Sequence, residues 1–186
     1  MTGTLLDRIP PDGRTLVRGP SNVGKTRLTA AALDRHLELH GPRNVAVLEF
    51  APEIRVDDRM IGGRLDRFVD VPGTVWVGKI DARAPRLESE TEAEVLALAA
   101  QNAAAAERVM AAMPDRPRAL FVNDATIPFQ HPASNPARWL ARWKDAETAV
   151  CNGFQGTELG EGTIGTRERL VQNLLEAWAT TVLELG

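Results

Sequence analysis

The sequence predicts an α/β fold of three layers, in which helices cover both faces of a mostly parallel sheet of five to six strands. Two observations support this prediction. Short apolar runs rich in β-branched residues alternate with segments of helical periodicity along the chain. These runs are nearly continuous rather than alternating, which is typical of strands that are buried on both faces of a parallel sheet. We therefore expect right-handed crossovers, and a ligand site beyond the carboxyl ends of the strands.

The first half of the chain contains three of the expected strands and one helix. The first strand is short and leads into a glycine-rich turn, and Gly41-Pro42 ends the helix that follows. Two further apolar runs have the length and β-branched content of buried strands. The expected elements are a strand over Arg14–Arg18, a helix over Lys25–His40, a strand over Asn44–Phe50 and a strand over Thr74–Ile80.

The second half begins with the longest expected helix. Ser89 and Glu92 have the spacing of a capping box, in which each side chain binds an amide at the helix start. The glycine-rich segment 152–166 holds too few apolar residues for a core, and we interpret it as a mobile loop that closes over a site. The expected elements are a helix over Ser89–Met113, a strand over Arg118–Asn123, a helix over Ala137–Trp143, a strand over Ala146–Cys151, a helix over Thr166–Trp178 and a strand over Thr180–Leu185.

The size and charge of the chain limit its function class. Its 186 residues are the size of one domain, 1–186, with 1–13 as a short N-terminal extension. A net charge of −3 argues against bulk nucleic acid or a membrane surface as the partner, although it permits a local pocket for a small anion. One cysteine and three scattered histidines argue against a disulfide or zinc cluster. We expect a cytoplasmic protein, with a homo-oligomer as an open alternative.

The most informative motif lies between the first expected strand and helix. The run Gly19-Pro20-Ser21-Asn22-Val23-Gly24-Lys25-Thr26, followed by Arg27, matches the phosphate-binding pattern G-x-x-x-x-G-K-[ST]. Its glycines let the backbone amides turn toward a phosphate, and the helix start presents further amides and the positive end of its dipole. We expect Lys25 to bind the β- and γ-phosphates and Thr26 to bind Mg²⁺. The nucleotide is ATP or GTP, since no base-specifying motif is visible.

Such a site also needs an acid at the end of a second strand, where it holds the water shell of the metal. Arg118–Asn123, followed by Asp124, supplies this strand. Two alignments are open. With a strand one residue longer, Asp124 is the metal-side acid beside Thr26. Otherwise Asn123 takes that place, and Asp124 lies where related ATPases carry the carboxylate that activates water. Glu49, near the end of its strand, is a second candidate for polarising the attacking water. The catalytic candidates are thus Lys25, Asp124 and Glu49.

Further polar residues follow the later strands. Asn152 ends the strand over Ala146–Cys151, where a polar side chain can sense the γ-phosphate. Arg167 and Arg169 are candidates for neutralising charge during transfer, although a surface position on the helix is the commoner role for each. Cys151 fits a small buried side chain better than a nucleophile.

The Gly19–Thr26 motif resembles that of the P-loop NTPase superfamily. Two strands, near Val45 and Val75, lie between this motif and the Asn123-Asp124 strand. This arrangement resembles the RecA-like branch, where an extra strand separates the two motif strands. Two cobalamin-pathway families of this branch are most similar. Asn44–Phe50 resembles the second strand of the cob(I)alamin adenosyltransferases, and Val150–Gly186 resembles the final part of the adenosylcobinamide kinase/guanylyltransferases. Asn123-Asp124 replaces the Asp-Glu of the first family, and Arg59–Phe68 lacks the histidine of the second.

The sequence therefore predicts a Mg²⁺-dependent ATP-binding protein of the P-loop class. The favoured activity is that of a small-molecule kinase, a nucleotidyl- or adenosyltransferase, or an NTPase, with an acceptor bound by the segments 51–64, 125–136 and 152–166. Two alternatives stay open. One is a nucleotide-dependent switch or assembly ATPase, and the other is a binding module in which Asn123 marks lost catalysis.

Overall fold

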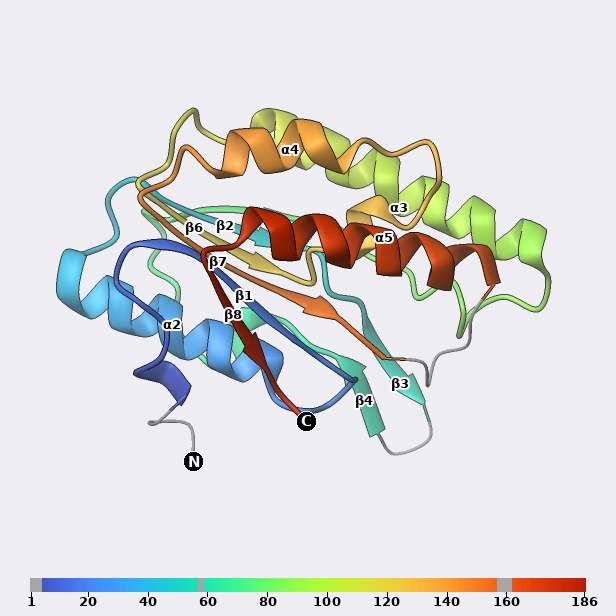
Figure 1. Ribbon diagram of the computed structural model, residues 1–186, viewed down its shortest axis with the longest axis horizontal. Coiled ribbons are helices and arrows are strands. Elements are labelled where there is room, and N and C mark those ends of the chain that lie inside the picture. The colour runs from blue at the N-terminus through green and yellow to red at the C-terminus, as the bar shows by residue number, and fades with distance from the viewer. Residues whose placement is uncertain (1–4, 57–58, 157–161) are drawn as a thin grey trace.

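A six-stranded parallel sheet forms the centre of the protein (Figure 1), in a computed structural model that describes residues 5–56, 59–156 and 162–186. The strand order is β5-β2-β6-β7-β1-β8, and every neighbouring pair is parallel. This confirms the predicted α/β class and the parallel sheet. The strands are β1 (Gly13–Gly19), β2 (Val45–Glu49), β5 (Trp76–Lys79), β6 (Ala119–Asn123), β7 (Thr148–Phe154) and β8 (Thr181–Glu184).

Helices lie on both faces of this sheet, so that the molecule has three layers (Figure 1). One face packs on α2 (Lys25–His40), and Val17 of β1 belongs to the core on that side with Leu33 of the helix. The other face packs on α3 (Glu92–Ala112), α4 (Pro136–Trp143) and α5 (Gly162–Trp178), and Leu16 points into that second core. Among the described residues, no helix combines the length and apolar character needed to cross a membrane.

A small antiparallel hairpin follows β2 and was not among the expected elements. It consists of β3 (Glu53–Val56) and β4 (Arg59–Gly62). A short 3₁₀ helix, η1 (Leu65–Arg67), comes after it, and a second, η2 (Ile127–Phe129), follows β6. The sequence does not predict the hairpin, because the apolar residues between β2 and η1 are few and interrupted by charges.

The start of α3 differs from the prediction. The capping box of α3 joins Thr91 and Glu94 rather than Ser89 and Glu92, since Thr91 Oγ1 accepts from the Glu94 amide at 3.3 Å. The two pairs have the same spacing in the sequence, and spacing alone therefore could not separate them.

The predicted loop 152–166 is shorter in the structure. Residues 152–154 extend β7, where Phe154 pairs with Gly19 of β1, and α5 already begins at Gly162. The middle of the expected loop, 157–161, lies outside the described residues, so the prediction of a mobile closing segment stays a prediction.

Candidate functional site

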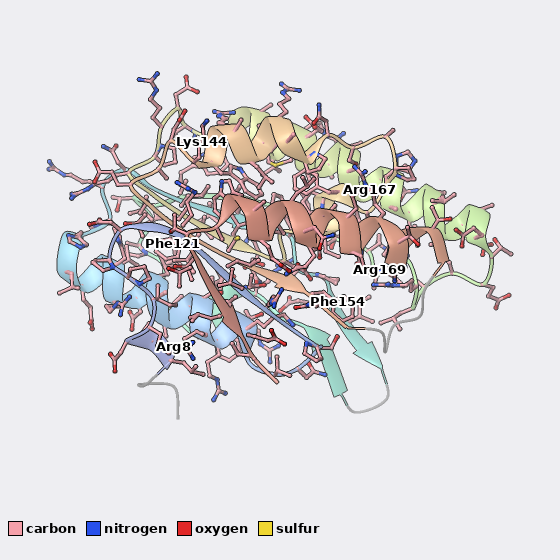
Figure 2. The ribbon with its side chains drawn as sticks, viewed as in Figure 1. Arg8, Phe121, Lys144, Phe154, Arg167 and Arg169 are labelled. Carbon is pink, nitrogen blue, oxygen red and sulfur yellow. The ribbon has the colours of Figure 1, made fainter. Side chains whose placement is uncertain are left out.

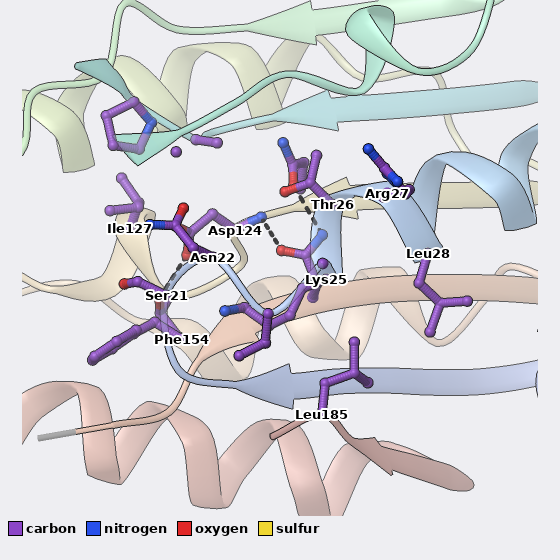
Figure 3. A pocket seen from close by; sticks show the side chains of 18 of the residues that line it. Ser21, Asn22, Lys25, Thr26, Arg27, Leu28, Asp124, Ile127, Phe154 and Leu185 are labelled. Atoms are coloured by element: carbon purple, nitrogen blue, oxygen red, sulfur yellow. Dashed lines mark hydrogen bonds between the residues drawn. The ribbon is translucent and has the colours of Figure 1, made fainter. Parts of the chain in front are cut away.

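A cavity of about 940 Å³ opens at the carboxyl edge of the main sheet (Figure 3). Its lining comes from the segments that follow β1, β2 and β6, from the ends of β7 and β8, from residues 84–87 after β5, and from α5. In a parallel sheet these segments meet at one edge, as the sequence prediction required. The cavity therefore collects the expected loops around one space.

The loop after β1 has backbone angles that explain its glycines. Gly19 has a φ of +149°, and a Cβ atom there would lie 2.1 Å from the carbonyl oxygen of Leu185. Asn22 and Gly24 also have positive φ, at 62° and 97°. Gly24 is the N-cap of α2, which has no side-chain cap and no acidic residue in its first turn. The amides and positive dipole end of α2 therefore start at the cavity without a carboxylate from the helix's own first turn, which favours an anion there.

Lys25 and its neighbours line the cavity with Ser21, Asn22, Val23 and Gly24. The Lys25 ammonium donates hydrogen bonds to the carbonyl oxygens of Gly19, at 2.8 Å, and of Pro20. It also lies 6.0 Å from the centre of the Phe154 ring. Arg27, two residues further along, stacks on Phe68, with 5.4 Å between the guanidinium carbon and the ring centre. Of the predicted phosphate-binding residues, Ser21 to Arg27 thus border one cavity, whereas Gly19 and Pro20 are not among its lining residues.

Asn123, rather than Asp124, faces Thr26. The Thr26 hydroxyl donates to Asn123 Oδ1 at 3.2 Å, and Asn152 Nδ2 donates to the same oxygen at 2.8 Å. Asn123 Nδ2 donates to Glu49 Oε1 and to the carbonyl oxygen of Gly63. This geometry corresponds to the second alignment left open by the sequence, in which the strand ends at Asn123.

Asp124 follows in a left-handed conformation, with a φ of +58°, and lines the cavity. Its amide donates to Asn152 Oδ1 at 3.0 Å, and its carboxylate accepts from the Thr126 hydroxyl at 2.8 Å. Desolvation raises the pKa of Asp124, while the hydrogen bond from Thr126 and the positive charges of Lys25 and Arg86 oppose that rise. Asp124 is thus a carboxylate that faces two cations across the cavity and has an enhanced affinity for a proton.

Glu49 lies behind this site rather than in it. Its side chain is 4% exposed, and Glu49 is not among the residues that line the cavity. One carboxylate oxygen accepts from Asn123 Nδ2 and the other accepts from the Leu65 amide at 2.8 Å. Desolvation raises the pKa of Glu49 to about 7, although these hydrogen bonds favour the ionised form. Glu49 therefore positions the Asn123 amide, and a direct role in polarising water stays a prediction.

Three residues on the far wall of the cavity were missed in the sequence. Arg86 donates to Glu168 Oε2 at 2.7 Å, and Gln130 Nε2 donates to Glu168 Oε1, also at 2.7 Å. Arg86 also lies over the ring of Phe154, at 5.6 Å. Its place after the third expected strand was the only available signal, because these residues form no motif and are widely separated in sequence.

The two arginines proposed for charge neutralisation lie elsewhere on α5 (Figure 2). Arg167 donates to the carbonyl oxygens of Phe129, at 3.1 Å, and Ser134, at 2.5 Å. Arg169 donates to the Thr166 hydroxyl. Neither is among the residues that line the cavity, whereas Arg86 is. The arginine that lines the cavity beside Glu168 therefore comes from the segment after β5.

The donor atoms around Thr26 fit a magnesium ion that arrives with its ligand. They are the Thr26 hydroxyl, the Asn123 amide oxygen and, further into the cavity, the Asp124 carboxylate. No cluster of three or more histidines, cysteines or acids occurs among the residues that the structure describes. Mg²⁺ commonly keeps several waters and takes only one or two protein carboxylates beside phosphate oxygens, so the oxygen donors present here are suitable.

Comparison with known proteins does not assign this site. No family model matches the chain, and no curated protein matches its sequence.

Proposed function

We propose that this chain is a Mg²⁺-dependent, ATP-binding protein of the P-loop NTPase class, with the topology of the RecA-like branch, which transfers a phosphoryl group to a small acceptor. The observation that carries the proposal is the loop Gly19–Thr26, which joins β1 to an uncapped α2 at the edge of a cavity. The strand order supports the branch, because β7 lies between β1 and the Asn123 strand β6.

The proposed binding of the triphosphate uses groups that are now bonded to one another. The Lys25 ammonium exchanges its hydrogen bonds to the carbonyl oxygens of Gly19 and Pro20 for hydrogen bonds to phosphate oxygens. The amides at the start of α2 also donate to the phosphates. The residues that would hold Mg²⁺ on this side are Thr26, through its hydroxyl, and Asn123, through its amide oxygen, which now bond to each other. The bound ion supplies positive charge that offsets the charge of the phosphates.

In the proposed transfer, Asp124 is the base. Arg86 is the arginine that lines the cavity, in place of Arg167 and Arg169. As the acceptor oxygen bonds to the γ-phosphorus, its O–H proton passes to the Asp124 carboxylate. The bond from the γ-phosphorus to the bridging oxygen breaks, and a nucleoside diphosphate leaves. The raised pKa of Asp124 favours such a role, since a base is most effective when its pKa approaches the working pH.

The cavity supports an acceptor over simple nucleotide binding. Pockets for one small ligand span about 300–1,000 Å³, and this cavity of about 940 Å³ is at the upper end. Arg86 and Glu168 provide polar groups on its far wall, away from the phosphate-binding loop.

Asn123 favours a second candidate, a nucleotide-binding module with weak or lost catalysis. Its amide brings no negative charge to the position beside the metal, whereas an acid would. The amide oxygen and the amide nitrogen are both hydrogen-bonded within the protein. The two candidates differ in turnover. Nucleoside diphosphate production that an acceptor accelerates supports transfer, and tight binding with no turnover supports the module.

The shared premise is tested by measuring nucleotide affinity calorimetrically for MgATP and MgGTP. Lys25→Ala is expected to weaken binding about 10- to 100-fold, because charge-assisted hydrogen bonds to phosphate are lost. The matched control is Lys144→Ala. Lys144 is exposed after α4, at the opposite end of β7 from Phe154 (Figure 2), and this variant should bind like the parent. Equal affinity of Lys25→Ala and the parent would contradict the proposal.

A further inference from the structure

The far wall of the cavity contains a buried polar group that the proposed nucleotide site does not use. Gln130 and Glu168 are 2% and 5% exposed, and both line the cavity. The Gln130 amide nitrogen donates to Glu168 Oε1, and Arg86 donates to Glu168 Oε2. These contacts orient the three side chains relative to one another.

This arrangement leaves one strong acceptor unsatisfied. Gln130 Oε1 is buried and has no hydrogen-bond partner among the residues that the structure describes. Rotation of the amide by half a turn does not help, because it would place the oxygen against a Glu168 carboxylate that can only accept when ionised. Buried polar atoms of native proteins are nearly always bonded, to protein, water or ligand. Gln130 Oε1 therefore favours a ligand group that donates a hydrogen bond to it.

The charges of the wall indicate the class of that donor. Arg86 forms an ion pair with Glu168, and among the described residues the carboxylate of Asp124 interacts electrostatically with both. A triphosphate bound at Gly19–Thr26 would add negative charge to the same cavity. Both features disfavour an anionic ligand at this wall, because like charges repel strongly in a site of low polarity. Phe154 and Ile127 supply apolar surface beside the polar groups.

We propose that Gln130, Glu168 and Arg86 form the acceptor subsite, and that the acceptor is a neutral small molecule bearing hydroxyl groups, one of which donates to Gln130 Oε1. This inference rests on the proposed function and names the substrate class for it. The carboxylate of Glu168 and the guanidinium of Arg86 position the Gln130 amide, and Asp124 lies within the same cavity to face the reacting hydroxyl.

The test is ligand-observed NMR with a defined panel, recorded with and without saturating MgADP. The panel contains neutral compounds (glycerol, ribose, inositol and uridine), anionic ones (glycerate and ribose 5-phosphate) and the cation ethanolamine. We expect neutral compounds to bind and the anionic ones not to bind. Gln130→Leu, which keeps the bulk but removes the acceptor, should weaken their binding at least tenfold while MgADP affinity stays unchanged. Gln101→Leu, at an exposed position on α3, is the matched control.

If Gln130→Leu does not fold, a second variant, Glu168→Gln, tests the same subsite. Glu168→Gln retains the shape of the side chain but loses the charge that holds Arg86, and it should weaken the same compounds. The inference is overturned when no neutral compound binds, when only charged members bind, or when both variants bind the neutral compounds as the parent does. Failure of the parent to bind MgADP would instead contradict the proposed function, and the recordings without nucleotide separate these two results.

Discussion

Replacing Asn123 by the aspartate expected at such a position should destabilise this protein rather than improve it. The reason is the hydrogen-bond network of the amide. Asn123 Nδ2 donates to Glu49 Oε1 and to the Gly63 carbonyl oxygen, and both of these partners are acceptors. In Asn123→Asp a second carboxylate oxygen takes the place of this donor. At a pH above the pKa of Glu49, about 7, it would face an ionised Glu49 carboxylate inside the protein, where neither charge is exposed to water.

The magnitude follows from the two bonds lost. A hydrogen bond to a charged group contributes about 1.5–3 kcal/mol, and a buried carbonyl left without a donor costs about 1–3 kcal/mol. Together they predict a loss of about 2.5–6 kcal/mol in the free energy of unfolding. Since domains are stable by about 5–15 kcal/mol, Asn123→Asp should remove a large part of the total.

A double substitution tests the reasoning directly. In E49Q/N123D the amide introduced at position 49 can donate to the carboxylate introduced at position 123. The pair should therefore recover about 1.5–3 kcal/mol relative to N123D alone. Stability is measured by urea unfolding, followed by tryptophan fluorescence. Asn135→Asp is the matched control, because Asn135 caps α4 and aspartate caps a helix equally well. An N123D variant as stable as the parent, or a double variant no better than N123D, would refute the account.

Two further predictions concern Glu49 and Gly19. Burial raises the pKa of Glu49 from 4.5 to about 7, so its protonated form favours the folded state. This contribution is complete below pH 4.5 and is lost as the pH rises through about 7, so the unfolding free energy of the parent should fall by about 3 kcal/mol relative to Glu49→Gln over that range, measured by urea titrations at several pH values. Gly19→Ala would bring a Cβ atom to 2.1 Å from the Leu185 carbonyl oxygen, and thermal melts should show a large loss of stability. The control is Gly73→Ala, where nothing lies within 4 Å of the added Cβ atom, and it should melt like the parent. Equal melting of both variants would contradict the close approach at Gly19.

The features predicted correctly from the sequence are local ones. The strand β1, the loop Gly19–Thr26 and the helix α2 are adjacent along the chain, so apolar runs, glycines and a helix stop signal were enough to place them. The parallel sheet followed from the apolar strands, and with it the edge where the cavity opens.

The features that the sequence left open depend on contacts between distant segments. The end of β6 is set by its register with β2, where Asn123 lies beside Glu49, and no local signal separates Asn123 from Asp124. Arg86 and Glu168 are 82 residues apart and meet only because β5 ends and α5 begins at the same edge of the sheet. The same reasoning explains why Arg167, in an expected position on its helix, points to loop carbonyls instead of the cavity.

The most direct test of the central claim is a crystal structure with a non-hydrolysable ATP analogue and Mg²⁺. The account predicts a triphosphate along Gly19–Thr26, with Lys25 released from the loop carbonyls and the metal beside Thr26, near Asn123 and Asp124. A triphosphate bound elsewhere, or a Lys25 ammonium still bonded to the carbonyl oxygens of Gly19 and Pro20 beneath a bound nucleotide, would contradict it.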